Sequence, residues 1–152
     1  MLQSLDHFFT GLGIALQPGN LLFCFIGALC GTLIGVLPGI GPVATIAMLL
    51  PVTFYLSPVA ALIMLAGIYY GSQYGGSTTS ILMRVPGETA SVVTCLDGYQ
   101  MALRGRAGSA LAIAALGSFF AGIVGTMLNV LFGPEFAKLA LAFGSAEYFG
   151  LM

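Results

Sequence analysis

The stretch GVLPGIGP, residues 35–42, decides the fold that this sequence predicts. It separates two runs that are almost wholly apolar, one over residues 21–34 and one that begins VATIAMLLPV after Pro42. Glycine adopts backbone angles that other residues avoid, as at Gly39 or Gly41. Proline suits the first position of a helix, because its missing N–H is not needed there. The stretch therefore predicts that one helix ends within it and that a new helix begins at Pro42.

The composition places these runs in a membrane. The chain has 152 residues, of which 59% are hydrophobic and 6% are charged, whereas soluble domains carry about 25% charged residues. No charged residue lies between Asp6 and Arg84, and a second charge-free stretch covers residues 107–134. Each stretch exceeds the roughly 20 residues that cross a bilayer. We therefore expect an all-α integral membrane protein, a multi-span helical bundle with broken or re-entrant helices.

Glycines at helical spacing predict where these helices pack. Gly27, Gly31 and Gly35 recur every four residues, and such a small-residue stripe lets a neighbouring helix approach closely. A second stripe, with Gly117 and Gly125, lies on the most uniform apolar segment, which we expect to end at Gly133-Pro134. The expected helical segments are residues 1–20 at the membrane surface, then 21–37, 42–56, 59–83, 89–103, 107–132 and 136–152.

A second glycine-rich stretch, YGGSTTS at residues 74–80, is expected to break the helix over residues 59–83. Ser77 or Thr78 would cap the short helix that follows. Non-helical backbone survives in a membrane only when it is buried in protein or lines a watery cavity. In transporters, half-helix N-termini bind anions and unwound carbonyls hold a coupling cation. Two such termini could converge on one carboxylate, although a kink or a surface loop explains each break equally well.

Charged and reactive residues are few. Residues 84–106 hold five of the nine charges, and their arginines favour a cytoplasmic loop, with the N-terminus outside and three crossings before Arg84. Glu88 and Asp97 form an acid–base pair or, as the simpler alternative, are solvated charges and ion-pair partners of the arginines. The one histidine, His7, lies near the N-terminus. We therefore expect no enzyme, no metal site and no cofactor, and the absence of a basic face excludes nucleic acid as a partner.

Four segments together resemble a known family. They are GTLIGVLPGIGPVATIAMLLP at residues 31–51, IYYGSQYGGSTTSIL at 68–82, VPGETASVVTCLDGYQMALRGRAG at 85–108 and GSAEYFGLM at 144–152. In this order they resemble the TctA family, the large membrane subunit of the tripartite tricarboxylate transporters.

The resemblance implies a multi-pass permease of the bacterial inner membrane. Such permeases take up citrate and other carboxylates, driven by a sodium or proton gradient. A periplasmic solute-binding protein delivers the substrate, and a small membrane subunit accompanies the permease. Residues 1–152 would be the N-terminal part of a longer permease domain. The alternative is a structural or assembly membrane subunit that does not transport.

The resemblance also implies which residues matter. The family's glycine–proline motif falls on Gly35, Pro38, Gly39, Gly41 and Pro42, its glycine–hydroxyl motif on Tyr70, Gly71, Gly75, Gly76, Ser77, Thr78 and Thr79, and its third motif on Pro86, Gly87, Glu88, Asp97 and Gly98. We take as candidate substrate- or ion-binding residues Gly39, Gly41, Pro42, Gly75, Gly76, Ser77, Thr78 and Thr79. The motif residues with an expected structural role are Gly35, Pro38, Pro86, Gly87, Glu88, Asp97 and Gly98.

Overall fold

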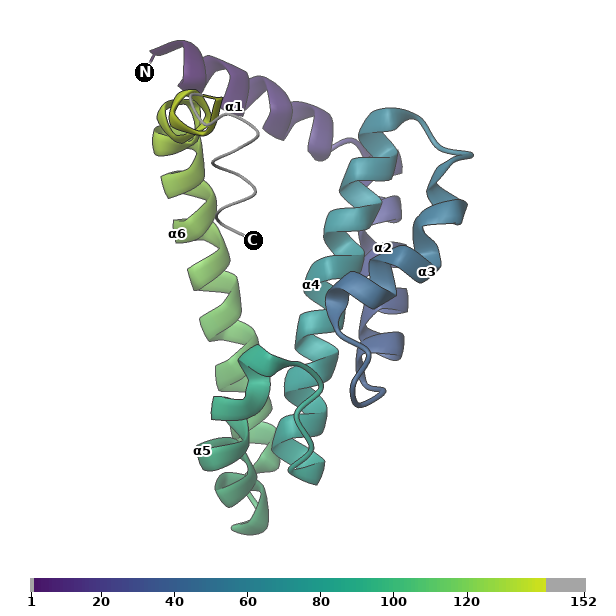
Figure 1. The fold of residues 1–152 in the computed structure, drawn as a ribbon, viewed down its shortest axis with the longest axis vertical. Helices are drawn as coiled ribbons and strands as arrows, with labels where there is room; N and C mark the ends of the chain where they lie inside the picture. Colours follow the sequence, from purple (N-terminus) through teal and green to yellow (C-terminus); the bar gives the residue numbers. More distant parts are fainter. Residues whose placement is uncertain (1, 142–152) are drawn as a thin grey trace. The chain divides into compact units, whose positions relative to one another are not determined.

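The structure, a computed structural model, describes residues 2–141 (Figure 1). Within them the chain forms α-helices and one short 3₁₀ helix, with no strand, which confirms the all-α class. The elements are α1 (Leu2–Ala15), α2 (Pro18–Gly35), α3 (Pro42–Thr53), α4 (Pro58–Met83), η1 (Thr89–Ser91), α5 (Val92–Leu103) and α6 (Ala107–Leu141).

The first predicted break is confirmed and the second is wrong. α2 ends at Gly35 and α3 begins with Pro42 at its first position. The stretch YGGSTTS does not interrupt α4, which is one continuous helix of 26 residues. Its hydroxyl groups bond to the preceding turn of the same helix, Ser77 to the carbonyl of Gln73 and Thr78 to that of Tyr74. Neither residue therefore caps a half-helix.

The expected end of the last long helix is also wrong. α6 continues through Gly133-Pro134 to Leu141. Proline removes one backbone hydrogen bond, a loss that helices in membranes accommodate. The predicted segment over residues 136–152 thus begins within α6, and its remainder lies outside the described residues.

The chain divides into two compact units, residues 13–117 on the one hand and residues 1–12 with 118–152 on the other. In the first unit, α2 and α4 lie side by side and run in the same direction (Figure 1). Their register shows this direction, because Gly27 faces Met64 and Gly35, further along α2, faces Ser72, further along α4.

Glycines on both helices make this contact close. A Cβ built on Gly31 would meet the carbonyl oxygen of Ile68 and lie 2.8 Å from its Cα. In the other direction, a Cβ on Gly67 would lie 2.5 Å from the carbonyl oxygen of Cys24. The predicted stripe is therefore confirmed. α4 contributes a matching stripe at the same spacing, formed by Gly67, Gly71 and Gly75. Backbone-to-backbone packing of this kind is what small residues allow between membrane helices.

The return between these parallel helices is short. α3 has 12 residues, which span about 18 Å at 1.5 Å per residue, whereas a bilayer core is about 30 Å thick. It starts beside the C-terminal end of α2 and leads back toward the beginning of α4 (Figure 1). The non-helical residues 36–41 and 54–57 must therefore cover the rest of the return.

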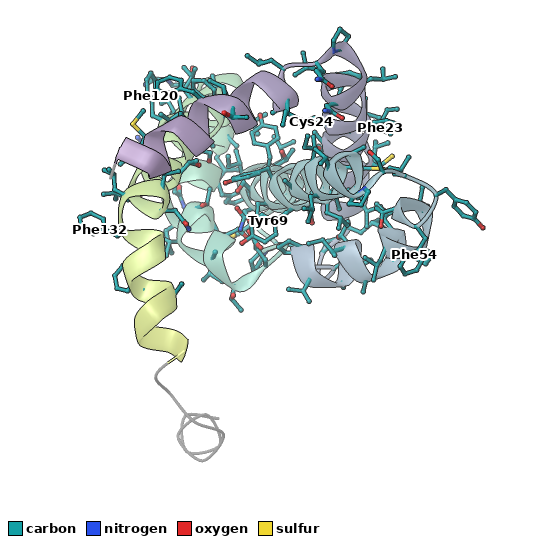
Figure 2. All side chains as sticks on the ribbon, turned by 90° about the horizontal axis from the view of Figure 1, so that it is seen from above. Phe23, Cys24, Phe54, Tyr69, Phe120 and Phe132 are labelled. Carbon is teal, nitrogen blue, oxygen red and sulfur yellow. The ribbon has the colours of Figure 1, made fainter. Side chains whose placement is uncertain are left out.

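In the part of the chain that the structure describes, two helices are long and apolar enough to cross a membrane, α2 and the part of α6 up to Gly133. α4 has the length but not the hydropathy, because its second half contains GSQYGGSTTS. Along α6, a Cβ added to Gly117 or Gly125 would meet no atom within 4 Å, so the predicted second stripe has no packing partner in the described part of the chain. Phe132 projects from α6 into open space (Figure 2).

Candidate functional site

Two non-helical segments converge on one glycine pair in α4. A Cβ on Gly75 would lie 2.5 Å from the carbonyl oxygen of Thr32 and 2.8 Å from the backbone nitrogen of Val36. The end of α2 and the entry to the break therefore lie against Gly75. Gly76, the next residue of α4, lies against a second segment, because a Cβ on Gly87 would collide with the Cα of Gly76. The loop after α4 thus folds back onto Gly76, and the pair marks where two segments distant in sequence approach α4.

The first break is a turn held by its own backbone. Val36 donates its N–H to the carbonyl of Thr32 at 3.1 Å, and Ile40 donates to that of Leu37 at 3.2 Å. Gly39 has a φ of 86°, in the left-handed region that favours glycine. This conformation turns the chain from α2 into α3, as the sequence predicted.

The N-terminus of α3 has no side-chain cap. Its N-cap residue is Gly41, which has no side chain to accept a hydrogen bond from the first turn. Val43, in that turn, is 77% exposed. The first helical N–H groups and the positive end of the helix dipole are therefore left for an outside acceptor. α4 begins with the same three residues, Pro-Val-Ala, but there Ser57 accepts the N–H of Ala60 at 3.4 Å.

A buried hydroxyl pair joins α3 to α4 beside this terminus. The side-chain oxygens of Thr45 and Ser72 lie 3.1 Å apart, and Thr45 also donates to the carbonyl of Gly41 at 3.1 Å. Both side chains are buried, with exposed fractions of 0% and 2%. The sequence analysis missed both residues. The available signal was a threonine in the first turn of an apolar helix and a serine two residues before the second glycine-rich stretch.

The serine and threonine hydroxyls that follow Ser72 in α4 are satisfied within the helix. Thr79 is buried and contacts the carbonyls of Gly75 and Gly76 at 3.2 and 3.1 Å. Ser77 and Thr78 are half-buried, and because each hydroxyl donates its proton, its oxygen can still accept a hydrogen bond. The residues of the glycine–hydroxyl motif thus surround the glycine pair without forming a second break.

The loop after α4 brings Glu88 to Gly76. Arg84 ends α4 with a φ of 58° and reverses the chain. Glu88 donates its N–H to the hydroxyl of Ser91 at 3.2 Å, and that hydroxyl donates back to the Glu88 carbonyl at 2.9 Å. The Cγ atom of Glu88 lies 3.8 Å from the position of a Cβ on Gly76. Burial raises the pKa of the Glu88 carboxyl above its ordinary value.

The other charges of this region lie apart from Glu88. Asp97 is exposed on α5, while its neighbour Gly98 packs on Ile81 of α4. The guanidinium of Arg84 lies over the ring of Tyr99, 5.8 Å from its centroid, an arrangement that favours a cation. Among residues 2–141, no hydrogen bond or ion pair joins Glu88 to Asp97.

Comparison with known proteins identifies what this chain resembles. The sequence model of the tripartite tricarboxylate transporter TctA family matches residues 21–152. An uncharacterized 52.8 kDa protein of Agrobacterium vitis, described by its place in the TAR-I ttuC' 3' region, is 61% identical over 152 residues, which are 100% of this chain and 30% of that protein. An uncharacterized protein of Methanocaldococcus jannaschii is 28% identical over 113 residues, 74% of this chain and 28% of that protein. The chain thus spans less than a third of these relatives, and no solved structure matches it.

Proposed function

The chain belongs to the tripartite tricarboxylate transporter TctA family, and from this membership we propose that it is part of a secondary transporter for tricarboxylates or related carboxylates. Citrate is the first substrate to test. The transporter would be a permease of the bacterial inner membrane, driven by a sodium or proton gradient. It would work with a periplasmic solute-binding protein and a small membrane subunit, the other parts of a tripartite system.

The observation that carries this proposal is the uncapped N-terminus of α3 at a break between two apolar helices. Free N–H groups and a positive helix end bind carboxylates and other anions. Secondary transporters use such half-helix termini to bind the substrate. A carboxylate of the substrate would bind at the first turn of α3, with Gly39, Gly41 and Pro42 shaping the approach.

The glycine pair of α4 would form the floor of this site. Because Gly75 carries no side chain, the entry to the break reaches the backbone of α4. Gly76 does the same for the loop that carries Glu88. The hydroxyls of Ser77, Thr78 and Thr79 lie on the next turn of α4 and would offer polar groups along the substrate path. Alternating access would then expose this level of α4 to each side in turn.

A proline substitution tests the role of the α3 terminus. Val43→Pro removes one N–H group from the first turn of α3, where the fixed φ of proline is compatible with a helix. A hydrogen bond to a charged group contributes about 1.5–3 kcal/mol, so uptake at low substrate should fall roughly ten- to hundred-fold. Val59→Pro is the matched control, because it removes the equivalent N–H at the Pro-Val-Ala start of α4.

The measurement is uptake of labelled citrate by cells that express the full-length permease with its partner subunits. The expected result is loss of uptake in Val43→Pro with normal amounts of protein in the membrane, and near-normal uptake in Val59→Pro. Equal uptake in both variants would refute the carboxylate site. A wild-type protein that assembles but moves no carboxylate would support the structural or assembly subunit instead.

A further inference from the structure

The loop after α4 does not continue away from the helix but returns along it. Arg84 takes a left-handed conformation, and three residues later the backbone of Gly87 contacts Gly76. Gly76 lies two turns before the end of α4 at Met83, about 10 Å back along the helix axis. Glu88 is therefore held beside the middle of the polar half of α4, at the level of the glycine pair.

The surroundings of Glu88 favour its neutral form. Its side chain packs on the bare backbone at Gly76 and is half-buried. From α4 the nearest charged residue in sequence is Arg84, whose guanidinium is directed at Tyr99 of α5. α5 adds the exposed Asp97, and η1 contains no titratable side chain. No basic group forms an ion pair with Glu88 within residues 2–141.

A negative charge at this position would act on the substrate. Gly75 and Gly76 are adjacent, so the break that leads to α3 and the loop that carries Glu88 approach α4 at the same level. Like charges repel strongly where water is scarce. A carboxylate at the break is therefore bound more easily when Glu88 is protonated, and its release is favoured when Glu88 loses that proton.

We propose that Glu88 is the residue that binds and releases the proton accompanying the carboxylate, which makes this transporter a proton symporter. The inference rests on the proposed carboxylate transport and adds the identity of the coupling ion and its site. The proton comes from water on the side of uptake, resides on a carboxyl oxygen of Glu88, and returns to water on the other side.

Two isosteric substitutions distinguish the role of Glu88 from the general effect of removing a negative charge. Glu88→Gln and Asp97→Asn each remove one negative charge from the same segment of the chain. In liposomes that contain the full-length permease, labelled citrate uptake is measured with and without an inwardly directed proton gradient. Exchange of internal for external citrate is measured in parallel, because exchange needs substrate binding and movement but no net proton transfer.

The expected result has three parts. The proton gradient stimulates uptake several-fold in the wild-type protein and in Asp97→Asn. In Glu88→Gln the stimulation disappears while citrate exchange continues. Stimulation of Glu88→Gln equal to that of the wild-type protein would overturn the inference, and so would wild-type uptake that follows a sodium gradient and ignores pH.

Further measurements keep the two proposals distinguishable. Absence of citrate exchange in the wild-type protein would refute carboxylate transport itself, and the coupling role with it. Exchange without proton stimulation would refute only the role of Glu88. If Glu88→Gln does not reach the membrane, Glu88→Asp decides, because a shorter acid in the same loop should shift the pH profile of uptake. An unchanged pH profile in that variant would contradict the inference.

Discussion

Gly31→Ala adds a methyl group to the middle of the contact between α2 and α4. The new Cβ would meet the carbonyl oxygen of Ile68 and lie 2.8 Å from its Cα and 2.9 Å from its carbonyl carbon. These atoms belong to the backbone of a helix, so they yield only if α4 moves as a whole. Overpacking a close contact costs about 1–3 kcal/mol, and rigid neighbours favour the upper value.

The net effect also includes helix propensity. Alanine is more favourable than glycine inside a helix by about 0.8–1.0 kcal/mol, so the expected loss of stability in Gly31→Ala is about 2 kcal/mol. Gly117→Ala on α6 is the control, because its Cβ would meet no atom within 4 Å. That variant should gain up to about 1 kcal/mol.

The assay is reversible denaturation of the purified protein in mixed micelles, which yields the free energy of unfolding. The two variants should differ by about 3 kcal/mol, which is more than a hundred-fold in the unfolding equilibrium. If both variants are equally stable, or if Gly31→Ala is the more stable one, then α2 and α4 do not approach as closely as their glycines imply.

Three further predictions follow from the site. Thr45→Val and Ser72→Ala should each lower stability by about 0.5–1.5 kcal/mol, and a double-mutant cycle that shows no coupling would contradict their hydrogen bond. Gly39→Ala should lower the free energy of unfolding by about 1–2 kcal/mol, because alanine disfavours the positive φ at this position. Gly87→Ala should displace the loop from α4, and the reactivity of a cysteine introduced into that loop would detect the displacement. The pKa of Glu88 is raised in the fold, so its contribution to stability is complete below the ordinary carboxyl pKa and is lost as pH rises through the raised value. The melting temperature should therefore fall as pH rises through that window. In Glu88→Gln this fall should be smaller.

Local sequence patterns predicted the parts of the fold that depend on local physics. The break at residues 35–42 follows from glycines and prolines that end one helix and start another, whatever surrounds them. The stripe that begins at Gly27 follows from a spacing that places small residues on one helix face. Both predictions needed only the geometry of a single helix, and the structure confirms both.

The second glycine-rich stretch shows where local reasoning fails. Gly75 and Gly76 look like a break in isolation, because glycine weakens a helix. In the folded chain their missing side chains admit the break residue Val36 on one side and the loop residue Gly87 on the other. The hydroxyls that follow satisfy themselves on the preceding turn. These contacts join residues far apart in sequence, so no local pattern reveals them, and the same holds for the bond between Thr45 and Ser72.

The parallel arrangement of α2 and α4 also sets an order of events during synthesis. Thr32 of α2 packs against Gly75, which the ribosome adds 43 residues later, since 75 − 32 is 43. At ordinary rates of translation this takes a few seconds. Throughout that time α2 is already made, but its glycine face has no partner helix. Any insertase or chaperone that accompanies the nascent chain must therefore shield a groove of bare backbone until α3 has turned the chain and α4 arrives.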